Sequence, residues 1–176
     1  RRPDRDNILR EDCHWFWHGV NGELGHHGVH SVDLCRWGLG VDFPIHVTSA
    51  GGRYHFQDDQ ETPDTHAVAF DFEDRKTITW VGLSCNEFRP GGSGEDVVFH
   101  GEKGSLSITG GGYTVRDEKG KPVQTVKGSG GDAEHQKNSL APIRGETQPT
   151  SAIPAGHTNT RLCPLGQSPT NSGHPP

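Results

Sequence analysis

The sequence predicts an α+β fold with a large, mostly antiparallel β-sheet of hairpins, a helix packed on one face, and an irregular C-terminal tail. Three observations support this prediction. A helical pattern follows the glycine-rich segment near Gly22, and alternating apolar and polar residues recur from residue 45 to 126. Prolines then become frequent after residue 141. Alternating runs joined by short polar turns are typical of antiparallel neighbours.

The predicted helix begins near His26 and ends near Gly38 or Gly40, where glycine can adopt the left-handed conformation that closes a helix. At about 100° per residue, four side chains share a stripe of roughly 60°: His26, His30, Asp33 and Trp37. The apolar residues lie on another side and can pack inward: Val29, Val32 and Leu39. Titratable groups gathered on an anchored helix indicate a functional site.

The middle of the chain is predicted to be a meander of strands: 45–50, 65–72, 77–85, 96–100, 105–108, 113–116 and 123–126. We expect one sheet face to be covered by helix and the other to be solvated or used for association. The acidic segment 57–64 is interpreted as a surface loop. A short helix is predicted over 132–144, interrupted by Pro142, and the later prolines argue against any long helix beyond it.

These patterns divide the chain into one domain over residues 1–130 and a short helix with an irregular or disordered tail over 131–176. The formal net charge is −6 and no basic block occurs, which argues against nucleic acid as the partner. No apolar run approaches the roughly 20 residues that span a bilayer, which argues against a membrane. The four cysteines form no CxxC pair and are interpreted as thiols.

The aromatic patch over residues 13–18 allows two interpretations. It is either a strand with one buried aromatic face, or a segment from which His14, Trp17 and His18 line a pocket, because indole faces stack on sugar rings and flat cofactors. Asn21, which follows this patch, is a further candidate for substrate binding.

Residues 22–33 (Gly-Glu-Leu-Gly-His-His-Gly-Val-His-Ser-Val-Asp) and 36–40 (Arg-Trp-Gly-Leu-Gly) resemble a signature of the Gfo/Idh/MocA oxidoreductases, the relatives of glucose–fructose oxidoreductase and inositol dehydrogenase. Residues 99–106 (Phe-His-Gly-Glu-Lys-Gly-Ser-Leu) resemble a later hairpin of that family, and residues 15–17 are similar to one bacterial branch. The resemblance covers roughly residues 13 to 126.

The resemblance implies the C-terminal, substrate-binding domain of an NAD- or NADP-dependent oxidoreductase that acts on a sugar, polyol or related hydroxy compound. It also implies that residues 1–130 serve in substrate binding and dimerisation, and that the protein is a homo-oligomer that associates through the sheet. The sequence contains no G-x-G-x-x-G after a strand and no Glu-Lys-Pro, so the dinucleotide site of the N-terminal Rossmann domain and the family's lysine are not in this chain. We therefore expect the isolated fragment to be inactive. We expect a cytoplasmic bacterial protein, or a periplasmic one if an export signal precedes Arg1.

Within the resemblance, His30 matches the family's catalytic histidine, whose role is that of a general acid/base during hydride transfer. Asp33 matches the later aspartate, which orients the histidine or a substrate hydroxyl. His26 is assigned to substrate binding, and it stands where many relatives carry aspartate. Gly28 allows the close approach at the start of the helix.

Two alternatives come from other classes of protein. The first is a His-rich metal-binding domain in which His26 and His30 bind Zn²⁺ from one helix face, with His14 or His18 as a third ligand. The second is a non-catalytic oligomerisation module whose sheet pairs subunits. The sequence does not identify the substrate or distinguish NAD from NADP.

Overall fold

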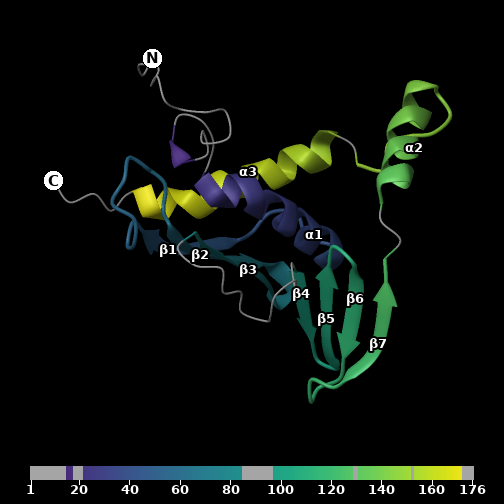
Figure 1. The fold of residues 1–176 in the computed structure, drawn as a ribbon, viewed down its shortest axis with the longest axis horizontal. Helices are drawn as coiled ribbons and strands as arrows, with labels where there is room; N and C mark the ends of the chain where they lie inside the picture. The colour runs from purple at the N-terminus through teal and green to yellow at the C-terminus, as the bar shows by residue number, and fades with distance from the viewer. Residues whose placement is uncertain (1–14, 18–21, 85–96, 129–130, 152, 172–176) are drawn as a thin grey trace. The chain divides into compact units, whose positions relative to one another are not determined.

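The fold is described from a computed structural model, which covers residues 15–17, 22–84, 97–128, 131–151 and 153–171 (Figure 1). The chain forms two compact units, one of residues 1–87 and 156–176 and the other of residues 88–155. Each unit contains one antiparallel sheet. The predicted α+β class is therefore confirmed, with the strands divided between two sheets.

The sheet of the first unit contains β1 (His46–Gly52), β2 (Thr65–Phe72) and β3 (Lys76–Leu83), in that order. Its strands are antiparallel, and Val68 pairs with Ser49 on one side and with Trp80 on the other. The alternation predicted for β2 is confirmed, since Val68, Phe70 and Phe72 are buried. The period of two residues thus sends one set of side chains into the core and the other away from it.

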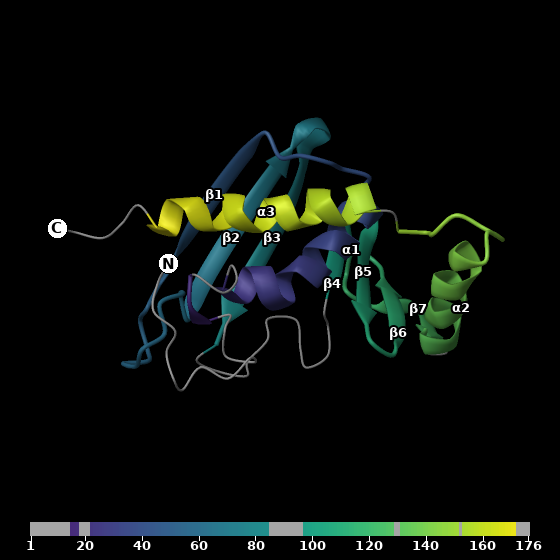
Figure 2. The ribbon, with the colours of Figure 1, turned by 90° about the horizontal axis from the view of Figure 1, so that it is seen from above.

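Two helical segments cover the buried face of this sheet (Figures 1 and 2). A π-helical turn, η2 (Leu24–Gly28), continues into α1 (Val29–Leu39), and the long helix α3 (Ile153–Asn171) runs beside it. Their apolar side chains meet those of the sheet in one core: Leu24, Val32, Val68, Phe70, Phe72, Ile78, Leu162 and Cys163. This cluster is what fixes α1 and α3 on the sheet.

The predicted helix of the glycine-rich segment is confirmed, although it begins earlier than expected. Val32 is buried and Val29 and Leu39 pack against the core, as the pattern predicts. Gly40 closes the helix with a φ of 63°, also as predicted. The helical chain begins before His26, because the π-helical turn already includes Leu24. Such turns are rare and occur frequently at functional sites.

The expectation that prolines prevent a long helix after residue 144 is wrong for α3. Pro154 is the second residue of this helix, where a missing N–H costs little, but Pro164 is internal. The helix persists because Leu162 and Cys163 are buried beside Pro164. Gly166 also lies so close to the sheet that a Cβ there would be 3.0 Å from Val68. Residues 144–151 contain no helix or strand, in agreement with the irregular segment predicted there.

The second unit contains a four-stranded sheet: β4 (Val97–Gly101), β5 (Gly104–Thr109), β6 (Gly112–Arg116) and β7 (Pro122–Lys127). The two hairpins predicted in this region are confirmed. Gly104 has a φ of +137°, and a Cβ there would lie 2.0 Å from the Arg116 carbonyl oxygen, so the turn requires glycine. Helix α2 (Asp132–Ile143) follows, with Pro142 near its end. The predicted helix over 132–144 is therefore confirmed.

Candidate functional site

The candidate site lies on the η2–α1 segment. The four side chains predicted to share a stripe are all exposed: His26, His30, Asp33 and Trp37. Trp37 is 79 % exposed, which is unusual for an indole. His26 belongs to the π-helical turn and His30 is the second residue of α1. The stripe therefore faces away from the core that anchors the helix.

The start of α1 is held by close packing against β3. A Cβ at Gly28 would lie 2.8 Å from Nε1 of Trp80 and 2.9 Å from Cδ1 of Leu24. Only glycine fits this distance, which explains the close approach expected at Gly28. Trp80 in turn lies edge-on to His66, with ring centroids 5.5 Å apart. The backbone between His26 and His30 thus packs against Trp80, which itself packs against His66.

The histidines of the turn differ in their contacts. The His27 ring lies 4.2 Å from the His26 ring, and its Nδ1 is 2.7 Å from a carboxylate oxygen of Glu23. In the part of the chain that the structure describes, no hydrogen bond joins the His30 imidazole to another residue. His30 is therefore open to solvent from a fixed backbone position.

The metal-binding alternative requires a third ligand beside His26 and His30. Among the described residues, no group of three His, Cys, Asp or Glu side chains is arranged to hold a metal ion. The proposed third ligands, His14 and His18, lie outside the described residues, as does Asn21.

Asp33 participates in a connected set of polar side chains that joins α1 to α3. A carboxylate oxygen of Asp33 accepts a hydrogen bond from the Asn159 amide, and the amide oxygen of Asn159 accepts one from Arg36. Arg36 also donates to the Asp42 carboxylate over 2.9 Å and to the Asp42 carbonyl oxygen over 3.2 Å. We call Asp33, Asn159, Arg36 and Asp42 the α1–α3 polar chain.

Of the four members of the α1–α3 polar chain, sequence reasoning assigned a role only to Asp33 and missed Arg36, Asn159 and Asp42. Arg36 was part of the quoted signature without a role, and it is buried by the packing of α1. Asn159 lies in the proline-rich segment where no helix was expected, and it is only 4 % exposed. No local signal identifies Asn159, because its importance depends on contacts with residues far away in the sequence.

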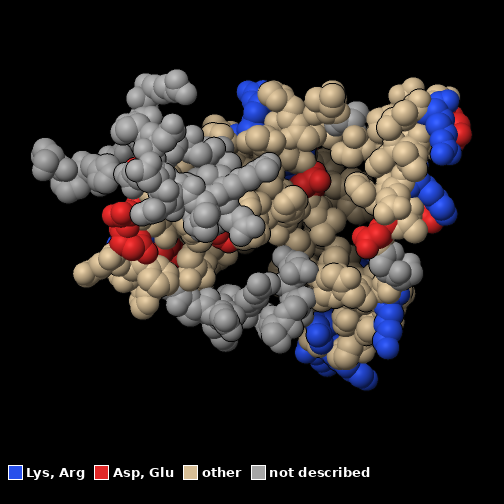
Figure 3. All heavy atoms as spheres, turned by 45° about the horizontal axis from the view of Figure 1, so that its top comes forward, with Lys and Arg blue, Asp and Glu red and all other residues tan. Residues whose placement is uncertain are grey.

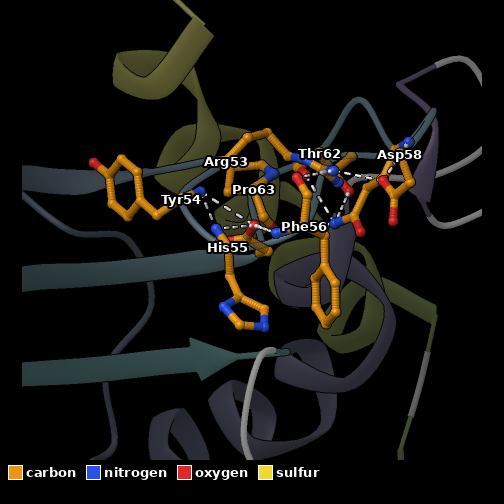
Figure 4. Close-up of polar contacts among 9 residues, drawn as sticks. Arg53, Tyr54, His55, Phe56, Asp58, Thr62 and Pro63 are labelled. Carbon is orange, nitrogen blue, oxygen red and sulfur yellow. Dashed lines mark hydrogen bonds and ion pairs between the residues drawn. The ribbon is translucent and has the colours of Figure 1, made fainter.

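A second ordered polar cluster forms the loop after β1 (Figure 4). The carboxylate of Asp64 is buried and accepts backbone N–H bonds of 3.0–3.1 Å from Tyr54, His55 and Phe56. Burial by itself raises the pKa of Asp64, but these hydrogen bonds outweigh it and the pKa lies below its ordinary value. Within segment 57–64, interpreted above as surface loop, Asp64 therefore has a structural role, whereas Asp58 and Asp59 are exposed.

Trp17 is hydrogen-bonded to the same loop. Its backbone N–H donates to a carboxylate oxygen of Glu61 over 3.1 Å, and the Trp15 carbonyl oxygen accepts bonds from the backbone of Glu61 and Thr62. The structure thus brings Trp17 to the acidic loop, and this contact was not expected.

On the face that Figure 3 shows, the Lys and Arg atoms lie in separate groups, and most of the described surface in this view is neither basic nor acidic. In the described part of the chain, no helix is both long and apolar enough to cross a bilayer.

The antiparallel sheet with η2, α1 and α3 packed on one face defines an α+β domain. Residues 1–107 match the model of the GFO/IDH/MocA C-terminal domain. This chain therefore belongs to the GFO/IDH/MocA family of oxidoreductases, as the sequence resemblance predicts. No curated protein sequence matches the chain.

Solved structures share the fold at low sequence identity. The WlbA dehydrogenase from Bordetella pertussis, solved with NADH and UDP-GlcNAcA, has a TM-score of 0.59 and 14 % identity over 95 % of this chain and 50 % of its own. An oxidoreductase from Bacillus cereus has a TM-score of 0.60 and 13 % identity over 84 % and 48 %. The yvaA protein from Bacillus subtilis has a TM-score of 0.66 and 15 % identity over 86 % and 51 %. The chain spans about half the length of these proteins.

Proposed function

We propose that this chain is the substrate-binding half of a nicotinamide-dependent oxidoreductase that acts on a sugar, polyol or related hydroxy compound. His30 is the general acid/base, and His26 and Asp33 contact the substrate. His14, Trp17, His18 and Asn21 are further candidates for substrate contact. We place the complete protein in the bacterial cytoplasm, or in the periplasm if it carries an export signal.

One observation carries this proposal. In a chain of this family, an exposed histidine with no hydrogen bond to any described residue stands at the start of a helix whose backbone is packed against Trp80. A group that exchanges protons with a substrate must be accessible and fixed in position. His30 meets both conditions by its place on α1.

The nicotinamide, when bound, accepts or donates the hydride. This chain has no G-x-G-x-x-G segment, so we assign none of its residues to the dinucleotide and propose that a Rossmann domain of the complete protein binds it. The role of this chain is to bind the hydroxy compound and to hold or release its hydroxyl proton at the His30 imidazole. On this basis the isolated chain has no turnover of its own.

The test uses the complete protein with NAD and NADP and a panel of polyols, sugars and nucleotide sugars, the last because the Bordetella relative was solved with UDP-GlcNAcA. Formation of reduced nicotinamide is followed by absorbance. His30→Ala should lower kcat/KM by about 10²–10⁴-fold without changing NAD(P) affinity. His27→Ala is the matched control, since His27 is an exposed histidine of the adjoining π-helical turn, and it should keep most activity. Unaltered turnover in His30→Ala would disprove the assignment.

We further propose that the complete protein is a homo-oligomer that associates through the outer face of the first sheet. That face presents two cross-strand rows without charge, Thr48–Ala69–Thr79 and Ala50–Ala67–Val81. Val81 is 54 % exposed there. Small, uncharged side chains in these rows suit close contact with the same surface of a second copy.

A further inference from the structure

The structure contains a residue whose contacts link the C-terminal helix to the candidate site. Asn159 of α3 is buried, and its amide lies between two residues of α1, Asp33 and Arg36. We propose that Asn159 is a positioning residue that sets the carboxylate of Asp33 for substrate binding. This inference rests on the proposed function, because it requires that Asp33 contacts the substrate.

The chemistry of the three groups fixes the orientation of the Asn159 amide. A guanidinium has only donors, so the side of the amide that faces Arg36 must be its oxygen. The NH₂ group is then directed to the other neighbour, and a carboxylate is the partner it requires. Asn159 therefore bridges a hydrogen-bond donor, Arg36, and a hydrogen-bond acceptor, the Asp33 carboxylate.

Arg36 is itself held from a second direction. It donates to both the carboxylate and the carbonyl oxygen of Asp42, which follows the end of α1. Two further contacts fix the surroundings: the Lys76 ammonium donates to the Leu39 carbonyl oxygen over 2.9 Å, and the Arg161 guanidinium lies 4.9 Å from the centre of the Phe43 ring. Arg36 therefore holds the amide oxygen of Asn159 in place, so that the amide nitrogen has a fixed position relative to Asp33. A positioning group requires such a fixed geometry.

This arrangement gives α3 a role beyond covering the core. Asp33 is exposed and projects from the same helix stripe as His30, whereas Asn159 is buried beneath it. One oxygen of Asp33 is engaged by the amide, which limits the rotation of the side chain. A carboxylate so held presents its other oxygen to a substrate hydroxyl at lower entropic cost than a free one.

The test exchanges the two polar groups in the complete protein. Asn159→Asp keeps an oxygen for Arg36 but replaces the donor to Asp33 by a second carboxylate, so we expect kcat/KM to fall by about 10–100-fold, mainly through KM. Asp33→Asn removes the carboxylate from the site and should lower activity at least as much. The double variant, Asp33→Asn with Asn159→Asp, restores an amide–carboxylate pair in reversed order.

The double variant separates positioning from a purely structural role. We expect it to regain the thermal midpoint lost in either single variant, while activity stays low because the site lacks its carboxylate. Recovery of activity together with stability would show that the pair only holds α3 to α1 and would overturn the inference.

Failure of the proposed function gives a different pattern. If His30→Ala and Asp33→Asn both keep wild-type turnover, the assignment of the site itself is wrong. If these two variants lose activity and a folded Asn159→Asp protein does not, only the role of Asn159 is wrong. Thermal midpoints measured for every variant identify any loss that is due to unfolding.

Discussion

The indole of Trp80 lies against the backbone of Gly28, so closely that a Cβ on Gly28 would be 2.8 Å from the indole Nε1 and 2.9 Å from Cε2. Trp80 lies on β3, an edge strand of the first sheet, and Gly28 is the last residue of the π-helical turn, directly before α1. The relationship connects the core of the sheet to the backbone on which His26 and His30 stand.

Replacing Gly28 by alanine should therefore disturb both stability and the site. The added methyl group must displace Trp80 or Leu24, and overpacking of this kind costs roughly 1–3 kcal/mol. We expect the thermal midpoint of Gly28→Ala to fall by about 2–10 °C in a domain of this size. Gly156→Ala in α3 is the matched control, because no atom lies within 4 Å of a Cβ there and alanine favours helix. Equal midpoints for the two variants would contradict the steric argument.

Asp64 should contribute more to stability than its neighbours in the acidic loop. In Asp64→Ala the N–H groups of Tyr54, His55 and Phe56 lose their common acceptor, which costs roughly 1–3 kcal/mol. Asp64→Asn keeps one acceptor oxygen and should cost less. The measurement is denaturant unfolding, with Asp59→Ala as the exposed control, expected within about 0.5 kcal/mol of wild type. A loss in Asp59→Ala as large as that in Asp64→Ala would argue against this role.

His66 should make the stability of the first unit depend on pH. It is 3 % exposed, and burial lowers its pKa, although a backbone hydrogen bond with Gly166 acts in the opposite direction. Its ring also hydrogen-bonds the Ser49 hydroxyl and faces Trp80 of β3. Because the folded pKa lies below the unfolded value, the unfolded state takes up the proton first as pH falls. Stability is fully present above about pH 6.5 and declines as the pH is lowered towards the folded pKa.

The measurement is the free energy of unfolding between neutral and mildly acidic pH. His66→Gln cannot be protonated, so it should show a shallower decline than wild type over this window. His55→Gln, at an exposed position, should retain the wild-type pH dependence. Parallel curves for His66→Gln and wild type would show that another group causes the decline.

The outer face of the first sheet should determine the oligomeric state. Val81→Glu places a charge in the row formed with Ala50 and Ala67, so we expect the complete protein to shift to a smaller species. Light scattering coupled to gel filtration measures the change. Val123→Glu on β7 is the control, since this valine is 61 % exposed on the other sheet, and it should leave the mass unchanged. A wild-type protein that is monomeric at high concentration would contradict the proposed interface.

The sequence by itself determined those elements whose pattern is local. The bounds of β2, the burial of Val68, Phe70 and Phe72, and the end of α1 at Gly40 all follow from periods of two or 3.6 residues and from the conformational freedom of glycine. The exposed stripe of His26, His30, Asp33 and Trp37 follows from the same helical period. The family was recognisable because its signature lies within one continuous segment.

Only the tertiary structure decided the features that depend on distant contacts. α3 forms in spite of Pro164 because the burial of Leu162 and Cys163 outweighs the lost backbone hydrogen bond. Asn159 reaches Asp33 and Arg36 across more than a hundred residues, and Asp64 is buried within a segment whose neighbouring acids are exposed. Local propensity describes only what each segment favours in isolation. The conformation of α3 and the positions of Asn159 and Asp64 depend instead on packing and on the requirement that buried polar groups have hydrogen-bond partners.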